Sequence, residues 1–331
     1  MAKIKSLLLV FMVLFSVSCK MKSQKPIAVS TAVKEVKPPL FNADSAYHFV
    51  AQQVDFGSRV PNSKAHRACG DYLVDQLTKY GAKVYQQKDV VMGYDGKQLQ
   101  MRNIIGAYND KNFKRILLAA HWDSRPWADN DPNPANHHTP ILAANDGASG
   151  VGLLLEVARL LQLQQPNIGV DIIFFDLEDY GTPQFAEGPD QENTWCLGSQ
   201  YWANHPHKEN YNARYGILLD MVGGKNATFF KEGISVEKAP GVVDKVWSIA
   251  ESLGHGALFV NRLGSYVTDD HLYVNQLANI PCIDIIAYEE HNQQSSFGSF
   301  WHTLNDNMDV IDKSTLKAVG ETITAVIYKE K

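Results

Sequence analysis

Residues 170–179 read Val-Asp-Ile-Ile-Phe-Phe-Asp-Leu-Glu-Asp, a short apolar run that closes on two adjacent carboxylates. A run this short, and this rich in isoleucine and phenylalanine, is typical of a strand buried on both faces of a parallel sheet. Glu178 and Asp179 would repel each other at its end unless a cation or a proton separates their roles. The stretch therefore predicts a central strand with a polar site at its carboxyl end.

Similar apolar runs alternate with amphipathic stretches along the chain, which is typical of an α/β sandwich. Strands are expected at residues 83–91, 99–108, 115–120, 170–177, 216–222 and 281–287, with the last four central in the sheet. Helices are expected at residues 44–54, 64–80, 149–163, 198–204, 242–253 and 313–328. Asn62 or Ser63 can cap the second helix, and Gly81 can end it. The fold class is therefore α/β.

Composition and charge narrow the classes of protein. The chain has 331 residues, of which 45% are hydrophobic and 20% charged, which is ordinary for a soluble enzyme. Its formal net charge of −5 provides no basic surface of the kind that nucleic acids require, so no DNA or RNA partner is expected. Cys69, Cys196 and Cys282 are widely spaced and match neither a disulfide framework nor a metal site.

The amino terminus resembles a targeting signal rather than part of the fold. Two lysines precede the apolar run 6–17, which is too short to span a bilayer as a helix. Residues 1–19 resemble a bacterial lipoprotein signal with Cys19 as the lipidated residue, and an ordinary cleaved signal peptide is the alternative. Residues 20–41 are expected to form a flexible tether. We therefore expect an exported protein, periplasmic or an outer-membrane lipoprotein facing the periplasm, that touches the membrane only through its lipid anchor.

Acidic and imidazole residues gather just after the expected buried strands. They are His121-Trp122-Asp123, Glu178-Asp179, Asp220 and, in a loop before residue 281, Asp269-Asp270-His271, and Trp301-His302-Thr303 adds a late imidazole beside an aromatic ring. Because open α/β sheets place their sites at the carboxyl ends of strands, this distribution indicates one shared site. Polar loops at 122–139, 182–193 and 289–299 are long enough to be functional as well.

Taken singly, these residues also have plainer interpretations. His121 and Asp123 point to one side of an extended backbone and suit zinc, or a carboxylate that orients a histidine, but a solvent-facing pair is the alternative. Asp146 precedes a helix and could belong only to its capping turn. Asp220 lies in an apolar run, where a carboxylate is costly unless it is paired or binds a metal. Ser149 lacks the strand–G-x-S-x-G–helix setting of a serine nucleophile.

The pattern resembles the M28 family of zinc aminopeptidases and the glutaminyl cyclases built on the same fold. The shared motifs are His121-x-Asp123, Asp146-Gly147, Glu178-Asp179, Asp220 and Trp301-His302-Thr303, and the likeness runs from about Asp44 to the end of the chain. The motifs similar to the cyclase branch, as found in Bacteroidetes, are His121-Trp122-Asp123-Ser124-Arg125, Asp269-Asp270-His271 and Phe297 ahead of Trp301. The resemblance implies one catalytic domain over residues 42–331. Its fold would be a three-layer α/β sandwich with a central mixed, mostly parallel and twisted sheet flanked by helices.

The resemblance also implies roles for individual residues. One zinc ion would be held by Asp146, Asp179 and His302, with Asp179 one methylene shorter than the glutamate of animal enzymes. Glu178 would be the general acid and base. The remaining implied residues are the supporting catalytic carboxylates Asp220 and Asp269, the pocket aromatics Phe297, Trp301 and Trp195, and the residues behind them, His121, Asp123 and His271.

In such an enzyme the γ-carbonyl of an amino-terminal glutamine is polarised by zinc, and Glu178 takes a proton from the α-amine that attacks it. A five-membered lactam closes and ammonia leaves. The implied partners are peptide or protein amino termini that bear glutamine, and the chain is expected to act as a monomer.

Two other functions remain open at this point. A dizinc aminopeptidase would take five ligands, and all of them are present: His121, Asp146, Asp179, Asp220 and His302. Sequence spacing cannot count metal ions, so this alternative stands beside the cyclase. A non-catalytic binding domain on the same fold is less favoured, because such domains typically lose metal ligands.

Overall fold

A mixed six-stranded sheet forms the centre of the computed structural model, which describes residues 37–187 and 193–331. Its strands are β1 (Lys83–Met92), β2 (Gln98–Tyr108), β3 (Arg115–His121), β4 (Gly169–Phe175), β5 (Gly216–Asp220) and β8 (Cys282–Ile286). Their order is β1-β2-β4-β3-β5-β8. The four strands β4, β3, β5 and β8 pair in parallel, while β1 and β2 add antiparallel pairings at one edge. The predicted mixed, mostly parallel sheet is confirmed.

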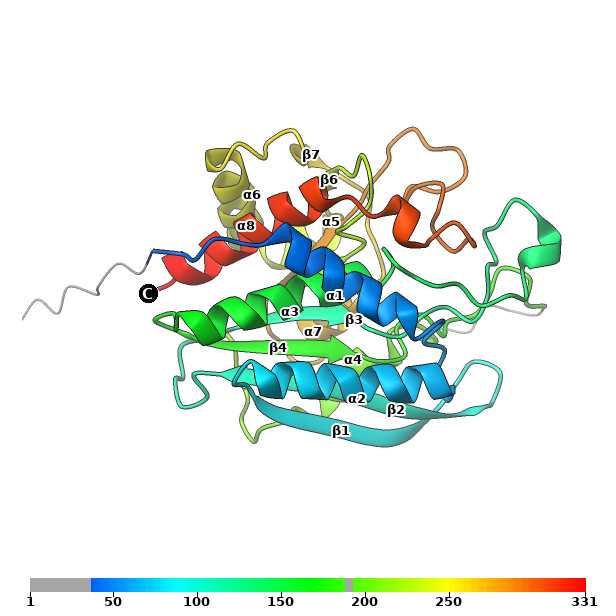
Figure 1. Ribbon diagram of the computed structural model, residues 1–331, viewed down its shortest axis with the longest axis horizontal. Coiled ribbons are helices and arrows are strands. Elements are labelled where there is room, and N and C mark those ends of the chain that lie inside the picture. Colours follow the sequence, from blue (N-terminus) through cyan, green and yellow to red (C-terminus); the bar gives the residue numbers. More distant parts are fainter. Residues whose placement is uncertain (1–36, 188–192) are drawn as a thin grey trace, which may run out of the picture. The chain divides into compact units, whose positions relative to one another are not determined.

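Helices cover both faces of this sheet. They are α1 (Ala43–Asp55), α2 (Lys64–Lys79), α3 (Ala148–Leu163), α4 (Leu197–Asn204), α5 (Gly233–Lys238), α6 (Pro240–Ser252), α7 (Asp270–Gln276) and α8 (Lys313–Lys329). Although far apart in the sequence, α1, α3 and α8 pack side by side over one face (Figure 1). The shorter α4 and α7 pack together against the other face.

The central strands have apolar side chains on both faces of the sheet, because alternate residues point into two different cores. In β3, Ile116 and Leu118 join the core under α1, α3 and α8, whereas Leu117 and Ala119 join a second core under α4 and α7. Both sets are buried because the sheet is covered on both faces. The carboxyl ends of these strands are thereby held at fixed positions, which is where the polar clusters occur.

The structure corrects several expected boundaries. The strand expected over residues 170–177 ends at Phe175, because Leu177 adopts a left-handed backbone conformation with φ of 59°. Likewise β5 ends at Asp220 because Met221 has φ of 48°. Of the two proposed caps for α2, Ser63 is the one used, since its side chain accepts the N–H of His66.

Two strands and two α-helices of the described residues were missing from the sequence prediction. They are the two-stranded sheet formed by β6 (Phe229–Lys231) and β7 (Phe259–Leu263), and the helices α5 and α7. The placement of Asp269-Asp270-His271 in a loop was wrong, because Asp269 caps α7 and the two following residues form its first turn. These elements are too short to show a clear hydrophobic period, so tertiary contacts decide them.

The amino-terminal predictions are not addressed by the fold. The signal over residues 1–19 and the tether from residue 20 to residue 36 lie outside the described residues. Among the residues that are described, no helix has the length and apolar character needed to cross a bilayer.

A buried ion pair offers a stability test. Asp171 on β4 is fully buried and binds the guanidinium of Arg115 through both carboxylate oxygens, while Tyr211 donates its hydroxyl to Asp171 over 2.8 Å. Replacing Asp171 by alanine leaves the Arg115 charge buried without its partner, so the free energy of unfolding should fall by about 3–5 kcal/mol. Chemical denaturation measures it. The exposed pair of Asp44 with Lys313, at 2.7 Å, provides the control, and Asp44→Ala should leave the free energy of unfolding nearly unchanged; equal losses in both variants would contradict this assignment.

Candidate active site

The carboxyl ends of three neighbouring strands, β4, β3 and β5, meet at one edge of the sheet. β3 ends at His121, β5 ends at Asp220, and the chain leaves β4 through a turn that carries Glu178 and Asp179. Asp123, two residues beyond β3, fixes that turn by accepting the backbone N–H of Glu178 over 3.1 Å and that of Asp179 over 3.2 Å. The parallel pairing thus brings three sequence clusters into contact.

A cavity of about 170 Å³ opens at this edge. It is lined by all nine residues that the resemblance assigned to catalysis, metal binding or substrate binding: Asp146, Glu178, Asp179, Trp195, Asp220, Asp269, Phe297, Trp301 and His302. His121, Asp123 and His271 are buried behind the lining. The cavity is therefore the candidate active site. The structure gathers its residues from the carboxyl ends of strands, the turns before α3 and α4, the start of α7 and the segment before α8.

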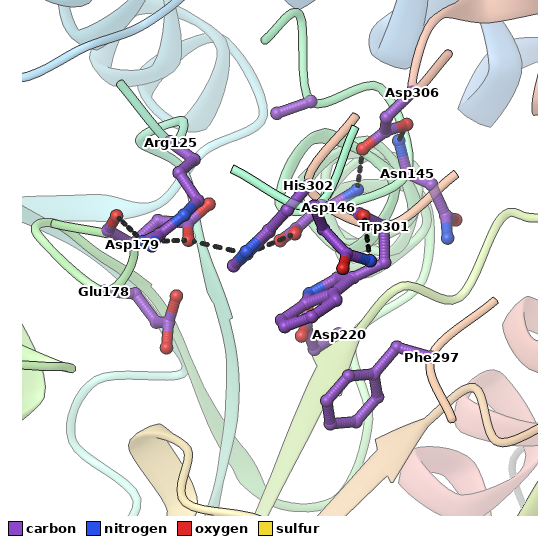
Figure 2. Close-up of polar contacts among 12 residues, drawn as sticks. Arg125, Asn145, Asp146, Glu178, Asp179, Asp220, Phe297, Trp301, His302 and Asp306 are labelled. Atoms are coloured by element: carbon purple, nitrogen blue, oxygen red, sulfur yellow. Dashed lines mark hydrogen bonds and ion pairs between the residues drawn. The ribbon is translucent and has the colours of Figure 1, made fainter. Parts of the chain in front are cut away.

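Three side chains form a group that can hold a cation. His302 Nε2 lies 3.1 Å from Asp179 Oδ1 and 3.5 Å from Asp146 Oδ2, so the imidazole stands between the two carboxylates (Figure 2). All three side chains are buried. Among the described residues, neither carboxylate oxygen of Asp179, nor Asp146 Oδ2, has a hydrogen-bond partner.

The donor set fits a metal ion. Two buried carboxylates that face one another repel unless a positive charge lies between them, and their unpaired oxygens would otherwise be costly. One imidazole nitrogen and two carboxylate oxygens are the ligand types that zinc accepts, and a set of three leaves a further position open. Burial and the charge of Asp179 raise the pKa of Asp146 to about 6 when no cation is present.

Arg125 and Asp129 support this group from behind, and sequence reasoning did not assign them a role. Arg125 donates two hydrogen bonds to Asp129, of 2.7 and 2.6 Å, and a third to the backbone carbonyl of Asp179 over 3.0 Å. Asp129 Oδ1 lies 3.5 Å from His302 Nδ1. Burial would raise the pKa of Asp129, but Arg125 and His302 outweigh it and hold the pKa well below its usual range. An ionised Asp129 therefore orients the imidazole so that Nε2 faces the cavity.

Asp306 is a second supporting residue that the sequence did not reveal. Its carboxylate accepts the backbone N–H of Asn145 over 2.7 Å and that of Asp146 over 3.0 Å, which fixes the turn before α3 (Figure 2). Burial and the charge of Asp146 raise the pKa of Asp306 to about 7. Nothing in the local sequence distinguishes Asp306 from a solvated turn residue, because its partners are 160 residues away.

Glu178 lies beside the metal-ligand group and reaches the same cavity. Its Oε1 accepts a hydrogen bond from Cys196 Sγ over 3.3 Å. Burial raises the pKa of Glu178 well above its ordinary value. His121 opposes this shift, whereas the negative charges of Asp179 and Asp269 add to it. A carboxylate with a raised pKa can both take and return a proton, as a general acid and base must.

Asp269 and Asp220 form the opposite wall. Burial and the charge of Asp220 raise the pKa of Asp269 to about 6. Asp220 Oδ1 lies 3.3 Å from His121 Nε2, and the described residues provide no hydrogen-bond partner for Asp269 Oδ2. Asp220 Oδ1, like Asp269 Oδ2, has no hydrogen-bond partner among the described residues, so both carboxylates can accept N–H groups of a bound molecule.

Aromatic rings enclose the cavity beside the metal-ligand group. Trp301 stacks on His302 with ring centroids 3.8 Å apart, and Phe297 packs against Trp301 at 5.0 Å. Trp195, inferred only from its place in the loop after the acidic pair, lies parallel to His302 at 6.1 Å. The guanidinium of Arg125 lies 4.5 Å from the Trp195 ring and fixes its orientation.

His121 belongs to a second group of possible ligands. Its Nε2 lies 3.0 Å from Asp146 Oδ1 as well as 3.3 Å from Asp220, and its Nδ1 lies 3.5 Å from Asp123. These positions keep His121, Asp146 and Asp220 close enough to share a cation. His271 is farther back and contacts Glu232, another residue that the sequence analysis missed.

Comparison with known proteins agrees with this arrangement. The model of peptidase family M28 matches residues 103–327. The chain is 59% identical to the glutaminyl cyclase of Bacteroides thetaiotaomicron, whose crystal structure superposes with a TM-score of 0.87 over 89% of this chain and 100% of that one. A Zn-dependent exopeptidase from Parabacteroides distasonis is 56% identical, with a TM-score of 0.87 over 89% of this chain and 100% of the other.

An aminopeptidase of Bacillus subtilis is more distant, at 26% identity over 260 residues. That alignment covers 75% of this chain but 49% of the aminopeptidase, so the chain spans about half the length of this relative.

Proposed function

The chain belongs to peptidase family M28, and on that premise we propose that it is a glutaminyl-peptide cyclotransferase, which converts an amino-terminal glutamine into pyroglutamate and releases ammonia. The observation that carries the proposal is the composition of one small cavity. Glu178, the metal-ligand group and three aromatic side chains surround a space suited to a single amino-terminal residue. The 59% identity with a glutaminyl cyclase that is covered over its whole length supports the same activity.

We propose zinc as the metal, with one ion per chain held by Asp146, Asp179 and His302. The unpaired carboxylate oxygens and the imidazole nitrogen support zinc, as does the likeness to a Zn-dependent exopeptidase. When bound, zinc supplies a Lewis acid beside the γ-carbonyl of the substrate.

Side chains of the protein carry out the proton transfer and hold the substrate in position. Glu178 takes a proton from the α-amine as its nitrogen forms a bond to the carbonyl carbon (Cδ) of the side-chain amide of the same glutamine. The bond from that carbon to the side-chain nitrogen breaks, and Glu178 returns the proton to this nitrogen, which leaves as ammonia. Asp220 and Asp269 accept N–H groups of the two nitrogens, and Trp301 and Phe297 hold the side chain folded for attack and exclude water.

A matched pair of peptides tests the activity. A peptide that begins with a free glutamine should release ammonia continuously, whereas the same peptide with an acetylated amine should release none because its nucleophile is blocked. Release from both peptides would contradict the proposal.

A dizinc aminopeptidase is the second candidate, and one observation favours it. His121, Asp146 and Asp220 form a second complete ligand group that shares Asp146 with the first. Metal analysis of the purified protein discriminates the cyclase from the aminopeptidase. A cyclase should contain one zinc ion per chain, and a dizinc aminopeptidase should contain two.

The contact between Asp129 and His302 leads to a further prediction. Asp129→Asn keeps the shape of the side chain but removes the charge that orients the imidazole, so zinc affinity should fall by roughly 10- to 100-fold. Competition with a chelator measures the affinity. Asp131→Asn in the same loop is the control, because the Asp131 carboxylate binds backbone and amide N–H groups rather than the imidazole. An unchanged zinc affinity in Asp129→Asn would show that Asp129 does not act through His302.

We further propose that the enzyme acts on peptide or protein amino termini outside the cytoplasm, as a monomer tethered through a lipid on Cys19. The support is the signal-like sequence of residues 1–19. Cells supplied with a radiolabelled fatty acid should label the wild-type protein but not Cys19→Ala. Export with no label in the wild type would favour an ordinary cleaved signal, and label retained in the variant would show that the lipid is not attached to Cys19.

A further inference from the structure

A buried carboxylate outside the cavity binds the chain on both sides of Asp269. Glu232, the residue before α5, is 2% exposed. Its Oε1 accepts the backbone N–H of Val267 over 3.0 Å, and its Oε2 lies 3.0 Å from His271 Nε2. Val267 and His271 are each two residues from Asp269, so one carboxylate brackets this residue of the cavity wall.

The same carboxylate is anchored to the body of the fold. Glu232 also accepts the N–H of Ile234 over 2.8 Å and the N–H and hydroxyl of Ser235 over 2.7 and 2.6 Å. Ser235 Oγ in turn accepts the backbone N–H of Asp284 over 2.9 Å, and Asp284 lies on β8. Since β8 pairs with β5, which ends at Asp220, this chain of contacts ties Asp269 to the strand that carries the facing carboxylate.

We propose that Glu232 is a positioning residue for the cyclotransferase reaction, and that its contacts with Val267 and His271 hold Asp269 in place against the substrate nitrogens. The proposal rests on the proposed function, in which Asp269 accepts an N–H group of the reacting residue. We refer to Glu232 and these two contacts as the Glu232 clamp.

The clamp needs an ionised carboxylate. Five donors converge on its two oxygens, two on Oε1 and three on Oε2, and an ionised carboxylate suits them because both of its oxygens only accept hydrogen bonds. Burial alone would raise the pKa of Glu232, but the hydrogen bonds from His271 and Ser235 outweigh it and lower the pKa to about 2. Glutamine at this position would turn an amide NH₂ group toward other donors and so break one side of the clamp.

The surrounding charges indicate how His271 transmits this restraint. Its other ring nitrogen, Nδ1, faces Asp284 Oδ2 at 3.9 Å and has no hydrogen-bond partner among the described residues. Nε2 is therefore the nitrogen that carries the proton to Glu232. Because His271 lies in the first turn of α7, which Asp269 caps, fixing its ring also fixes the start of that helix.

The experiment measures kcat, KM and zinc content for Glu232→Gln with a glutamine-initiated peptide. We expect kcat to fall by roughly 10- to 100-fold, with a smaller change in KM and unchanged zinc content, because a small displacement of Asp269 affects the reacting nitrogens more than binding. Glu237→Gln is the matched control: it alters an exposed contact, Tyr266 Oη to Glu237 Oε1 at 2.8 Å, between the same two segments. The control should keep the wild-type kcat.

Hydrogen exchange gives a second measurement that needs no turnover. In Glu232→Gln the backbone amides of residues 265–272 should exchange faster than in the wild type, and those of Glu237→Gln should not. If Glu232→Gln does not fold, Ser235→Ala, which keeps the carboxylate but removes one donor, should show the same changes in kcat and exchange to a smaller degree.

The possible outcomes separate the two proposals. A wild-type protein that releases no ammonia overturns the proposed function, whatever the variants do. If the wild-type protein is active, and folded Glu232→Gln has the same kcat and the same hydrogen exchange as the wild type, only the Glu232 clamp is overturned. In the double variant Glu232→Gln/His271→Gln, the fold-decrease in kcat should be smaller than the product of the two single fold-decreases. A fold-decrease equal to that product would contradict action through His271.

Discussion

Glu178→Gln is expected to lower kcat by roughly 10²- to 10⁴-fold, the range typical of a lost general acid and base. Glutamine has the shape of glutamate but cannot take the proton from the α-amine or return it to the leaving nitrogen. The cavity, with Asp146 and His302 on one side and Asp269 on the other, is otherwise unchanged. The variant should therefore bind zinc and peptide as the wild type does.

Zinc content and peptide affinity must be measured alongside turnover for this result to be informative. Glu209→Gln, at an exposed position, removes the same charge and should keep wild-type kcat. If Glu178→Gln retains most of the wild-type kcat, Glu178 does not transfer the proton. If Glu178→Gln instead loses its bound zinc, the substitution lowers kcat indirectly, through the metal.

His302→Ala should remove both bound zinc and measurable activity. The imidazole is the only nitrogen ligand in its group of three, and it lies within 3.5 Å of both carboxylates. Without it, Asp146 and Asp179 face each other with two ligands where zinc sites generally have at least three protein ligands. Trp301 and Trp195 would also lose the ring against which they pack.

Elemental analysis after dialysis measures the zinc that each protein retains. His291→Ala is a suitable control because His291 is highly exposed and lies outside the cavity lining. A His302→Ala protein with stoichiometric zinc and normal turnover would show that the metal is bound elsewhere, for example by the group that contains His121.

The sequence predicted the central part of the fold because the strands there are buried on both faces. Their side chains are mostly apolar, and carboxylates at the ends of such strands, such as Asp220 and the pair Glu178-Asp179, therefore indicate a site. Asp171, within β4, shows that a carboxylate inside such a strand can instead belong to a buried ion pair. The sharp turns at Leu177 and Met221, both with left-handed backbones, were not predictable from residues that rarely adopt this conformation.

The supporting residues were harder to predict than those lining the cavity. Asp306 binds a turn 160 residues earlier, and Glu232 is 39 residues from His271. Glu232 precedes α5, a helix of six residues whose sequence has no usable period. Residues of this kind act through partners that only the folded chain brings close, and no local pattern records such pairs.

We expect the cavity to join the α-amine to the side-chain carbonyl of one glutamine rather than to cleave the following peptide bond. Mass spectrometry of a glutamine-initiated peptide, after incubation with the zinc-loaded enzyme, tests it most directly. We expect a product that is lighter by one ammonia, keeps every residue and has a cyclised amino terminus. A product that has lost its whole first residue would rule out cyclisation and identify the chain as an aminopeptidase.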